Sequence, residues 1–234
     1  MRKVAYIVQF DSFWPVIGGG SVAGYLAGQG FNGVSFKVLD GDTFEGHWDH
    51  SSSGIKSLSD IASWAQDFRS HGLDVDVWVN VHKDNLDAQI NLWRQIRAIP
   101  GIGRFTLDTE PYADFWGDES DCSILVPTIT ELKLSITYDP RRLNWPGIGA
   151  CLDAAEFQFP QLYDPSWIGP AIASEQGHPH AVMEPLVPSW TGPDVWTAIL
   201  ANSQLGSFRG RSGYGVFSAP VTNAALVSAL QQME

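Results

Sequence analysis

The chain has 234 residues, of which 44% are hydrophobic and 17% are charged, and this composition excludes a disordered or collagen-like protein. Its length suits one globular domain over residues 1–234. The formal net charge of −12 argues against nucleic acid and anionic membrane surfaces as partners.

Short runs rich in β-branched and aromatic residues recur along the chain, and most are followed by a loop and then a helical pattern. The expected strands are Val4–Phe10, Gly33–Leu39, Val75–His82, Phe105–Glu110, Lys133–Tyr138, Glu156–Tyr163, Ala181–Val187 and Tyr214–Ser218. The expected helices are Gly20–Gln29, Ser57–His71, Asn85–Arg97, Thr191–Ala201 and Val221–Met233, with a weaker pattern over Pro165–Gly177. Repeated strand–helix units of this kind predict an α/β fold, a single (β/α)8 barrel of the TIM-barrel type.

Alternation along each strand predicts which side chains face the lumen of the barrel. In the expected strand Val75–His82 the valines should face the helices, which leaves Asp76, Trp78, Asn80 and His82 inside. The same reasoning turns Val4, Tyr6, Val8 and Phe10 outward and places Gln9, with Asp11 just beyond it, on the inner side. Further inward-facing positions are Lys37, Thr106, Asp108, Glu110, Lys133, Ser135, Thr137, Gln161 and Tyr163. Polar residues thus gather at the C-terminal strand ends, where barrel enzymes keep their chemistry.

The pair Asp108 and Glu110 is the candidate catalytic centre. Two carboxyl groups two residues apart on one strand share a face, so each can influence the proton affinity of the other. Glycoside cleavage needs a protonated carboxyl for the leaving oxygen and a second group that stabilises positive charge at the sugar carbon. Glu110, nearer the mouth, would be the acid and Asp108 its partner; in a 2-acetamido sugar the substrate's own carbonyl could be the nucleophile.

Other polar and aromatic residues would bind the sugar, and neither a cofactor nor a metal is expected. An indole face can stack on a pyranose ring, and several tryptophans fall in loops after strands. The candidate substrate-binding residues are Tyr163, Gln161, Asn80, His82, Lys37, Asp11, Trp14, Trp116 and Trp190, with Trp48 and Trp167 as further loop tryptophans.

Three short motifs resemble known glycosidases. Phe105-Thr-Leu-Asp-Thr-Glu-Pro-Tyr resembles the fourth-strand Asp-x-Glu of family 25 lysozymes and, more distantly, the end of the family 18 chitinase signature. Gly33-Val-Ser-Phe-Lys-Val-Leu-Asp-Gly is similar to the second strand of those lysozymes, and Phe159-Pro-Gln-Leu-Tyr163 to the sixth strand of chitinase-like and phage-encoded glycosidase-like barrels. The resemblance implies hydrolysis of a β-linked amino-sugar polymer such as peptidoglycan or chitin.

The sequence also leaves alternatives open. Asp108 and Glu110 could form a buried ionic network with Lys37 in a non-catalytic barrel, a carbohydrate-binding or structural protein such as a virion component. The cluster His47, Asp49 and His50 lacks the spacing of a standard metal site and suits a loop surface. Arg141-Arg142 could contact an acidic substrate, but a surface pair at a helix start is the simpler interpretation, and the orientation of Glu184 is ambiguous.

The start of the chain and its cysteines bear on the compartment. The run Val4 to Phe10 is too short for a signal peptide, and no apolar run approaches the roughly 20 residues of a membrane span. We therefore expect synthesis in the cytoplasm; a phage enzyme released by lysis would share this feature. Cys122 and Cys151 belong to no metal-spaced cluster, and buried thiols are favoured over a disulfide.

Overall fold

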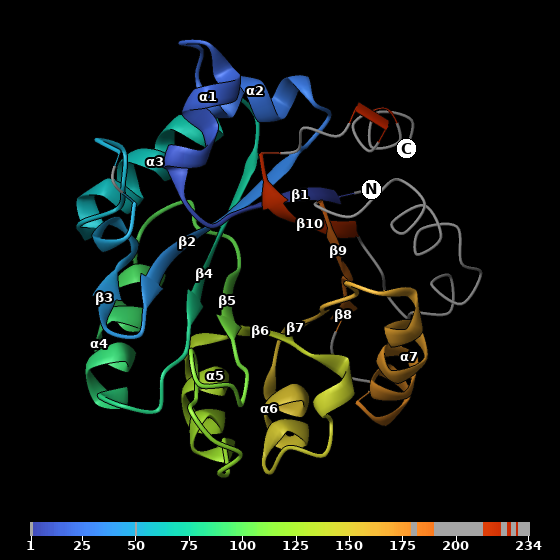
Figure 1. Cartoon of the computed structure of the whole chain (residues 1–234). Helices are drawn as coiled ribbons and strands as arrows, with labels where there is room; N and C mark the ends of the chain where they lie inside the picture. Colours follow the sequence, from blue (N-terminus) through green and yellow to red (C-terminus); the bar gives the residue numbers. More distant parts are fainter. Residues whose placement is uncertain are drawn as a thin grey trace.

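The computed structural model describes residues 2–49, 51–178, 182–189 and 213–220, together with 224, 225 and 228. Parallel strands form the centre and helices lie around them (Figure 1). The strands are β1 (Arg2–Ile7), β2 (Gly33–Asp40), β4 (Asp74–Asn80), β5 (Phe105–Asp108), β6 (Ser135–Tyr138), β7 (Phe157–Pro160), β8 (Val182–Met183), β9 (Leu186–Pro188) and β10 (Gly213–Ala219), and β3 (Thr43–Phe44) pairs antiparallel with β2.

The strands close into a ring. Each pairs with its neighbour in the order β8-β7-β6-β5-β4-β2-β1-β10-β9. Because β8 pairs with β7 while β9 pairs with β10, the single segment 182–188 joins both ends of that path. The fold is therefore the expected (β/α)8 barrel, with its seventh strand interrupted at Glu184 and Pro185.

Seven helices are found in the described part of the chain: α1 (Trp14–Ile17), α2 (Val22–Gly28), α3 (Leu58–Ser70), α4 (Leu86–Arg97), α5 (Val126–Leu132), α6 (Ile148–Ala154) and α7 (Ile168–Gly177). The helix α3 begins where expected because the Ser57 hydroxyl accepts a hydrogen bond from the Asp60 backbone N–H. The expected helices Thr191–Ala201 and Val221–Met233 lie outside the described residues, apart from 224, 225 and 228. No helix that the structure describes is long and apolar enough to cross a membrane.

The core has two layers, as strand alternation predicts. Between the strands and helices lie side chains such as Phe36, Val77 and Leu107, and inside the barrel lies a smaller cluster. That inner cluster consists of Val4, Tyr6, Trp78, Phe159 and Leu186.

The expected orientation of the first strand was wrong. Val4 and Tyr6 face the lumen, whereas Ala5 and Ile7 pack against the helices. Phe10 does face the helices, stacked on Trp64 at 4.1 Å, but the strand ends at Ile7 and a 3-10 helix begins at Phe10. The pairing of β1 with β10 also shifts between Tyr6 and Ile7, so alternation does not carry through this segment.

The structure also tests the expectations for Lys133 and for the two cysteines. Lys133 is exposed and ends α5 with a φ of 52°, so it does not face the lumen as expected. Cys122 and Cys151 are buried free thiols whose sulfur atoms lie 3.9 Å apart.

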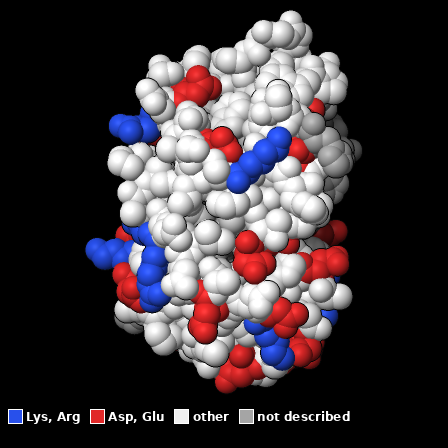
Figure 2. Space-filling model, turned by 90° about the vertical axis from the view of Figure 1, so that its left-hand side faces the viewer, with Lys and Arg blue, Asp and Glu red and all other residues white. Residues whose placement is uncertain are grey.

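On the face shown in Figure 2, acidic and basic side chains are interspersed.

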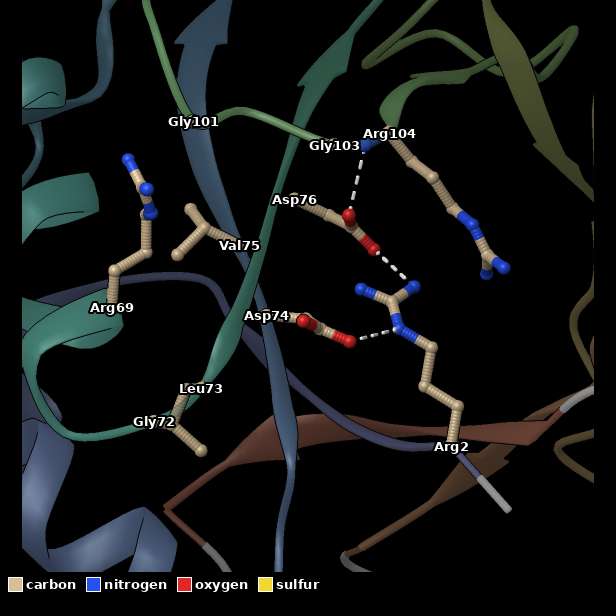
Figure 3. A pocket seen from close by; sticks show the side chains of 10 residues that line it. All are labelled: Arg2, Arg69, Gly72, Leu73, Asp74, Val75, Asp76, Gly101, Gly103 and Arg104. Carbon is tan, nitrogen blue, oxygen red and sulfur yellow. Dashed lines mark hydrogen bonds and ion pairs between the residues drawn. The ribbon is translucent and has the colours of Figure 1, made fainter.

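Ion pairs occupy the N-terminal end of the barrel. Arg2 binds Asp76 at 2.7 Å, and Arg104 binds Glu184 across the barrel. Arg104 also lies over the Phe157 ring at 3.7 Å. A cavity of about 460 Å³ opens at this end beside these groups (Figure 3). Because the charges here pair with one another, this end contributes to stability, as is usual for barrels.

Candidate active site

A second cavity, of about 340 Å³, lies at the opposite, C-terminal end of the strands. It is formed by the ends of β5, β6, β7 and β10 and the loops that follow them. Its lining is Asp108, Glu110, Tyr112, Phe115, Asp139, Arg141, Gln161, Tyr163, Trp167 and Phe217. The structure thus places Asp108, Glu110, Gln161 and Tyr163, all expected from the sequence, around one open space.

Backbone contacts hold the carboxyl pair in this position. β5 ends at Asp108, and the next residue, Thr109, donates its N–H to the Thr137 carbonyl of β6 at 3.2 Å. The Glu110 carbonyl accepts a hydrogen bond from the Trp116 N–H at 3.0 Å, which closes the loop back onto the strand end. Both carboxyl groups therefore continue the inward-facing set of β5.

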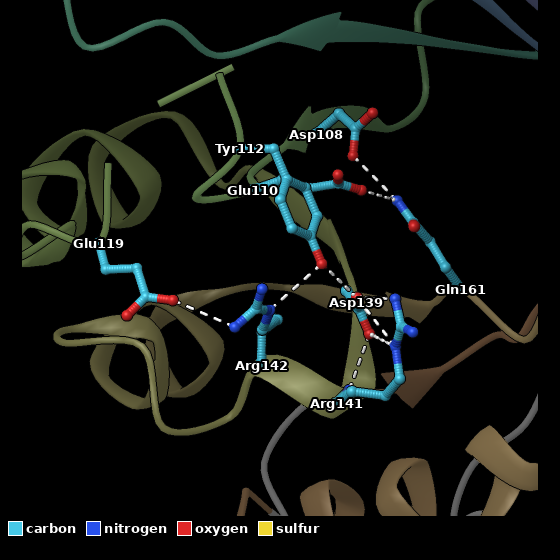
Figure 4. A network of polar contacts seen from close by, with 8 residues as sticks. All are labelled: Asp108, Glu110, Tyr112, Glu119, Asp139, Arg141, Arg142 and Gln161. Atoms are coloured by element: carbon cyan, nitrogen blue, oxygen red, sulfur yellow. Dashed lines mark hydrogen bonds and ion pairs between the residues drawn. The ribbon is translucent and has the colours of Figure 1, made fainter. Parts of the chain in front are cut away.

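Gln161 connects the two carboxyl groups. Its side-chain N–H group donates to Asp108 Oδ1 at 3.2 Å and to Glu110 Oε1 at 2.5 Å (Figure 4). Both carboxyl groups are buried, with Asp108 6% and Glu110 7% exposed. The two acids are therefore close neighbours in a site of low polarity.

This environment favours protonated carboxyl groups. Burial is the main cause that raises the pKa of Glu110 to about 7, and the nearby Asp139 charge raises it further. Burial and then the charge of Glu110 raise the pKa of Asp108 well above its ordinary value. Near neutral pH the pair therefore retains a proton, as a general acid requires.

Asp139 is a third carboxylate of the cavity, and the sequence analysis did not single it out. Arg141 binds it through the backbone N–H at 2.8 Å and through the guanidinium at 2.6 Å, and the Tyr112 hydroxyl donates to it at 2.7 Å. Hydrogen bonds to Arg141 and Tyr112 outweigh burial and lower the pKa of Asp139. Asp139 directly follows the expected strand Lys133–Tyr138, and this position at a C-terminal strand end could have identified it as a candidate site residue.

Aromatic rings form the remaining wall of the cavity. Tyr163 stacks on Phe217 with ring centres 5.8 Å apart, and Trp167 lies near Tyr163 at 5.9 Å. The Arg141 guanidinium lies over the Trp167 ring at 3.8 Å. Arg141 thus lies at the start of a short helix (3-10 helix Pro140–Arg142) with its side chain half exposed, as expected, and it also lines the cavity.

A second polar cluster centres on Asp40, at the end of β2. Asp40 accepts hydrogen bonds from Lys37 at 2.6 Å and Asn80 at 2.8 Å and contacts His82 Nε2 at 2.5 Å. Lys37 also pairs with the buried Glu45 at 3.1 Å. The structure therefore brings three expected site residues together, but around two carboxylates, Asp40 and Glu45, that the sequence analysis had not proposed.

Several expected binding residues lie elsewhere. Asp11, in the 3-10 helix after β1, and Trp14, half-exposed at the start of α1, do not line the cavity around Glu110. Trp116 is buried, packs edge-on against Trp145 and donates its indole N–H to Ser120, so this cavity has no open face of that ring. Trp190 lies outside the described residues.

Of the possible metal cluster, His47 and Asp49 lie in the described part of the chain. Asp49 accepts hydrogen bonds from the backbone N–H groups of Phe10 at 2.6 Å and Ser51 at 2.9 Å, which ties its loop to the start of the 3-10 helix Phe10–Phe13. His47 is exposed beside Trp48, and residue 50 is not described. In the described part of the chain no three His, Cys, Asp or Glu residues are grouped so as to hold a metal ion.

Comparison with known proteins identifies the fold. The sequence matches no protein-family model and no curated protein. Among solved structures, a family 113 β-1,4-mannanase aligns with a TM-score of 0.61 at 12% identity, covering 100% of this chain and 98% of that one. A family 26 endo-β-1,4-mannanase from Cellulomonas fimi aligns with a TM-score of 0.59 at 11% identity, covering 98% and 70%.

Other barrels are similar to a comparable degree. A tryptophan synthase α-subunit from Pyrococcus furiosus aligns with a TM-score of 0.55 at 14% identity, covering 99% of this chain and 92% of that one. At such low sequence identities the similarity shows only the barrel fold. The chemistry has to be inferred from the residues of the site.

Proposed function

We propose that the chain is a glycoside hydrolase that cleaves a β-linked polysaccharide, with Glu110 as the general acid. The observation that carries the proposal is a buried carboxyl whose pKa is raised to about 7, in an open cavity with aromatic walls. A proton held at this position can pass to the oxygen of a glycosidic bond. The family 26 and 113 mannanases among the structural neighbours show that this type of barrel can carry such a reaction.

In the proposed reaction, Glu110 gives its proton to the leaving oxygen as the bond from that oxygen to the sugar carbon breaks. Positive charge then develops at the carbon. While Glu110 holds the proton of the pair, Asp108, one step deeper in the barrel, is the charged member that stabilises this carbon, or that orients a 2-acetamido group of the substrate whose oxygen attacks it. Gln161 holds both carboxyl groups in fixed positions relative to each other through its two hydrogen bonds, and the Tyr163 hydroxyl can bind the sugar. When the acetamido oxygen attacks, it bonds to the sugar carbon as the leaving oxygen departs; water then displaces it and gives a proton back to Glu110, so two inversions retain the configuration of that carbon.

The charge of the cavity supports a substrate without acidic groups. Its lining carries three carboxyl groups, Asp108, Glu110 and Asp139, and one cation, Arg141, which is already bound to Asp139. The sequence motifs favour an amino-sugar polymer such as chitin or peptidoglycan glycan, whereas two structural neighbours act on mannan. An uncharged β-linked glycan satisfies both lines of reasoning.

The experiment is an assay for new reducing ends on peptidoglycan, chitin oligomers and β-1,4-mannan. We expect release from at least one of them, and a loss of about 100-fold or more in Glu110→Gln, which cannot donate the proton. Glu119→Gln is the matched control, because Glu119 is exposed and binds Arg142 outside the cavity. Full activity in Glu110→Gln would refute the assignment of the acid.

A non-catalytic glycan-binding barrel is the second candidate. It is favoured by the hydrogen bonds that engage the carboxyl groups: Gln161 binds Asp108 and Glu110, and both oxygens of Asp139 accept from Arg141. This candidate predicts saturable binding of one of the same glycans with no reducing ends released. Binding without turnover in the wild-type chain would therefore favour it over the hydrolase.

A further inference from the structure

A third hollow adjoins the cavity around Glu110. Its volume is about 280 Å³, and it lies between the loops that follow β4 and β5. Phe115 lines both hollows, so they meet at this half-buried ring. The lining of the third hollow includes His82, Lys83, Phe115, Trp116 and Asp118.

The structure holds His82 in a fixed position at the wall of this hollow. Its backbone N–H and carbonyl bind the buried side chain of Gln89 at 3.1 and 2.8 Å. Its Nε2 contacts Asp40, and the ring lies against Gly41, where a Cβ would approach it to 3.2 Å. Gly41 has a φ of +60°, a conformation that glycine adopts without strain. The other ring nitrogen of His82 has no hydrogen-bond partner in the described part of the chain.

An ion pair forms the rim of the same hollow. Lys83, after β4, binds Asp118, after β5, at 2.8 Å, and both side chains are about half exposed. The pair therefore presents a donor and an acceptor to solvent beside the aromatic residues Phe115 and Trp116. Hydroxyl groups around an apolar ring face are the features of a sugar that such a lining matches.

We propose that this hollow is a second sugar subsite, which binds a unit of the same glycan chain whose neighbouring unit occupies the cavity around Glu110. The inference rests on the proposed function, since it takes a glycan as the ligand. The shared Phe115 ring lies where the linkage between the two units passes. His82, Lys83 and Asp118 bind the hydroxyl groups of the second unit, so the chain prefers oligomers over the shortest sugars.

The test measures binding by calorimetry for N-acetylglucosamine and mannose, each as the monosaccharide and as the β-1,4-linked oligomer of six units. Every variant also carries Glu110→Gln, so that no oligomer is consumed. In the double variant Lys83→Ala/Asp118→Ala we expect the Kd for the six-unit oligomer to rise about tenfold while the Kd for the monosaccharide, which cannot fill both subsites, stays unchanged.

The control is Arg94→Ala/Glu131→Ala, which removes an equally exposed ion pair between α4 and α5. It should bind the oligomer and the monosaccharide as the Glu110→Gln parent does. If the parent binds the six-unit oligomer and Lys83→Ala/Asp118→Ala binds it equally well, or loses the oligomer and the monosaccharide to the same extent, the second subsite is refuted. If the wild-type chain neither binds nor cleaves any oligomer of the panel, the glycan function fails instead.

Discussion

The side-chain amide of Gln161 donates to Glu110 at 2.5 Å and to Asp108 at 3.2 Å, so one nitrogen directly after β7, the sixth strand of the barrel, binds both acids at the end of β5. These hydrogen bonds favour the charged carboxylates and lower the pKa of each acid, against the larger effect of burial. Gln161 therefore lowers the proton affinity of the pair, which burial raises, and also fixes its geometry.

Replacing Gln161 by Met, which keeps the length but removes the donor, should raise the pKa of Glu110 above about 7. A hydrogen bond to a charged group contributes about 1.5 kcal/mol, which corresponds to a shift of roughly one pH unit. The descending limb of the pH–activity profile should move upward by that amount. Titration of the Glu110 carboxyl by carbon NMR checks the same shift without activity, and an unchanged or lower value would contradict it.

Ionisation of Glu110 should also make stability depend on pH. The carboxyl has a pKa of about 7 in the folded chain, against 4.5 ordinarily, so from pH 4.5 to 7 the unfolded chain loses the proton first. Stability therefore decreases as pH rises through this window, by about 3 kcal/mol in total, and the loss is complete above pH 7. Wild-type activity should decline over the upper part of the same range, as the acid loses its proton.

Glu110→Gln cannot ionise at this position and so escapes this loss. Its stability relative to the wild-type chain should therefore be greater at pH 8 than at pH 5. Chemical denaturation at both pH values measures the difference, and Glu119→Gln controls for loss of an exposed carboxylate. A stability difference that is the same at both pH values would show that the Glu110 carboxyl is not protonated in the folded chain.

Asp40 should matter for stability because it accepts from Lys37, Asn80 and His82. Asp40→Asn removes one of the two carboxylates around the buried Lys37, and we expect a loss of about 2 kcal/mol, below the 3–5 kcal/mol typical of a buried cation left with no partner. The control is Asp42→Asn, which should change little, because Asp42 is exposed and accepts one long hydrogen bond of 3.3 Å from Asn85. Equal unfolding midpoints for the two variants would count against this role.

Glu184 lies at the opposite end of the barrel, where its partner is Arg104. Glu184→Gln leaves that cation without its carboxylate, so we expect a loss of roughly 3 kcal/mol in the free energy of unfolding. The turnover number per folded molecule should stay the same, because neither residue lines the cavity around Glu110. A thermal melt paired with the reducing-end assay separates the two effects, and a lower turnover at unchanged stability would place Glu184 in the chemistry.

The amino-acid sequence by itself determined the barrel and the carboxyl pair. Strand alternation depends only on residues two apart, so β2, β4 and β5 could be oriented from their own side chains, and Asp108 and Glu110 followed from the end of β5. It failed in β1, where the strand ends at Ile7 and the chain turns before Phe10.

Only the tertiary structure decided what surrounds that pair. The contact of Gln161 with both acids, the binding of Arg141 and Tyr112 to Asp139, and the cluster around Asp40 join residues from different strands and loops. Such contacts depend on loop paths and on the relative height of neighbouring strand ends, which no local periodicity encodes. Local patterns therefore predicted which side chains face inward, whereas the closed ring determined which of them meet.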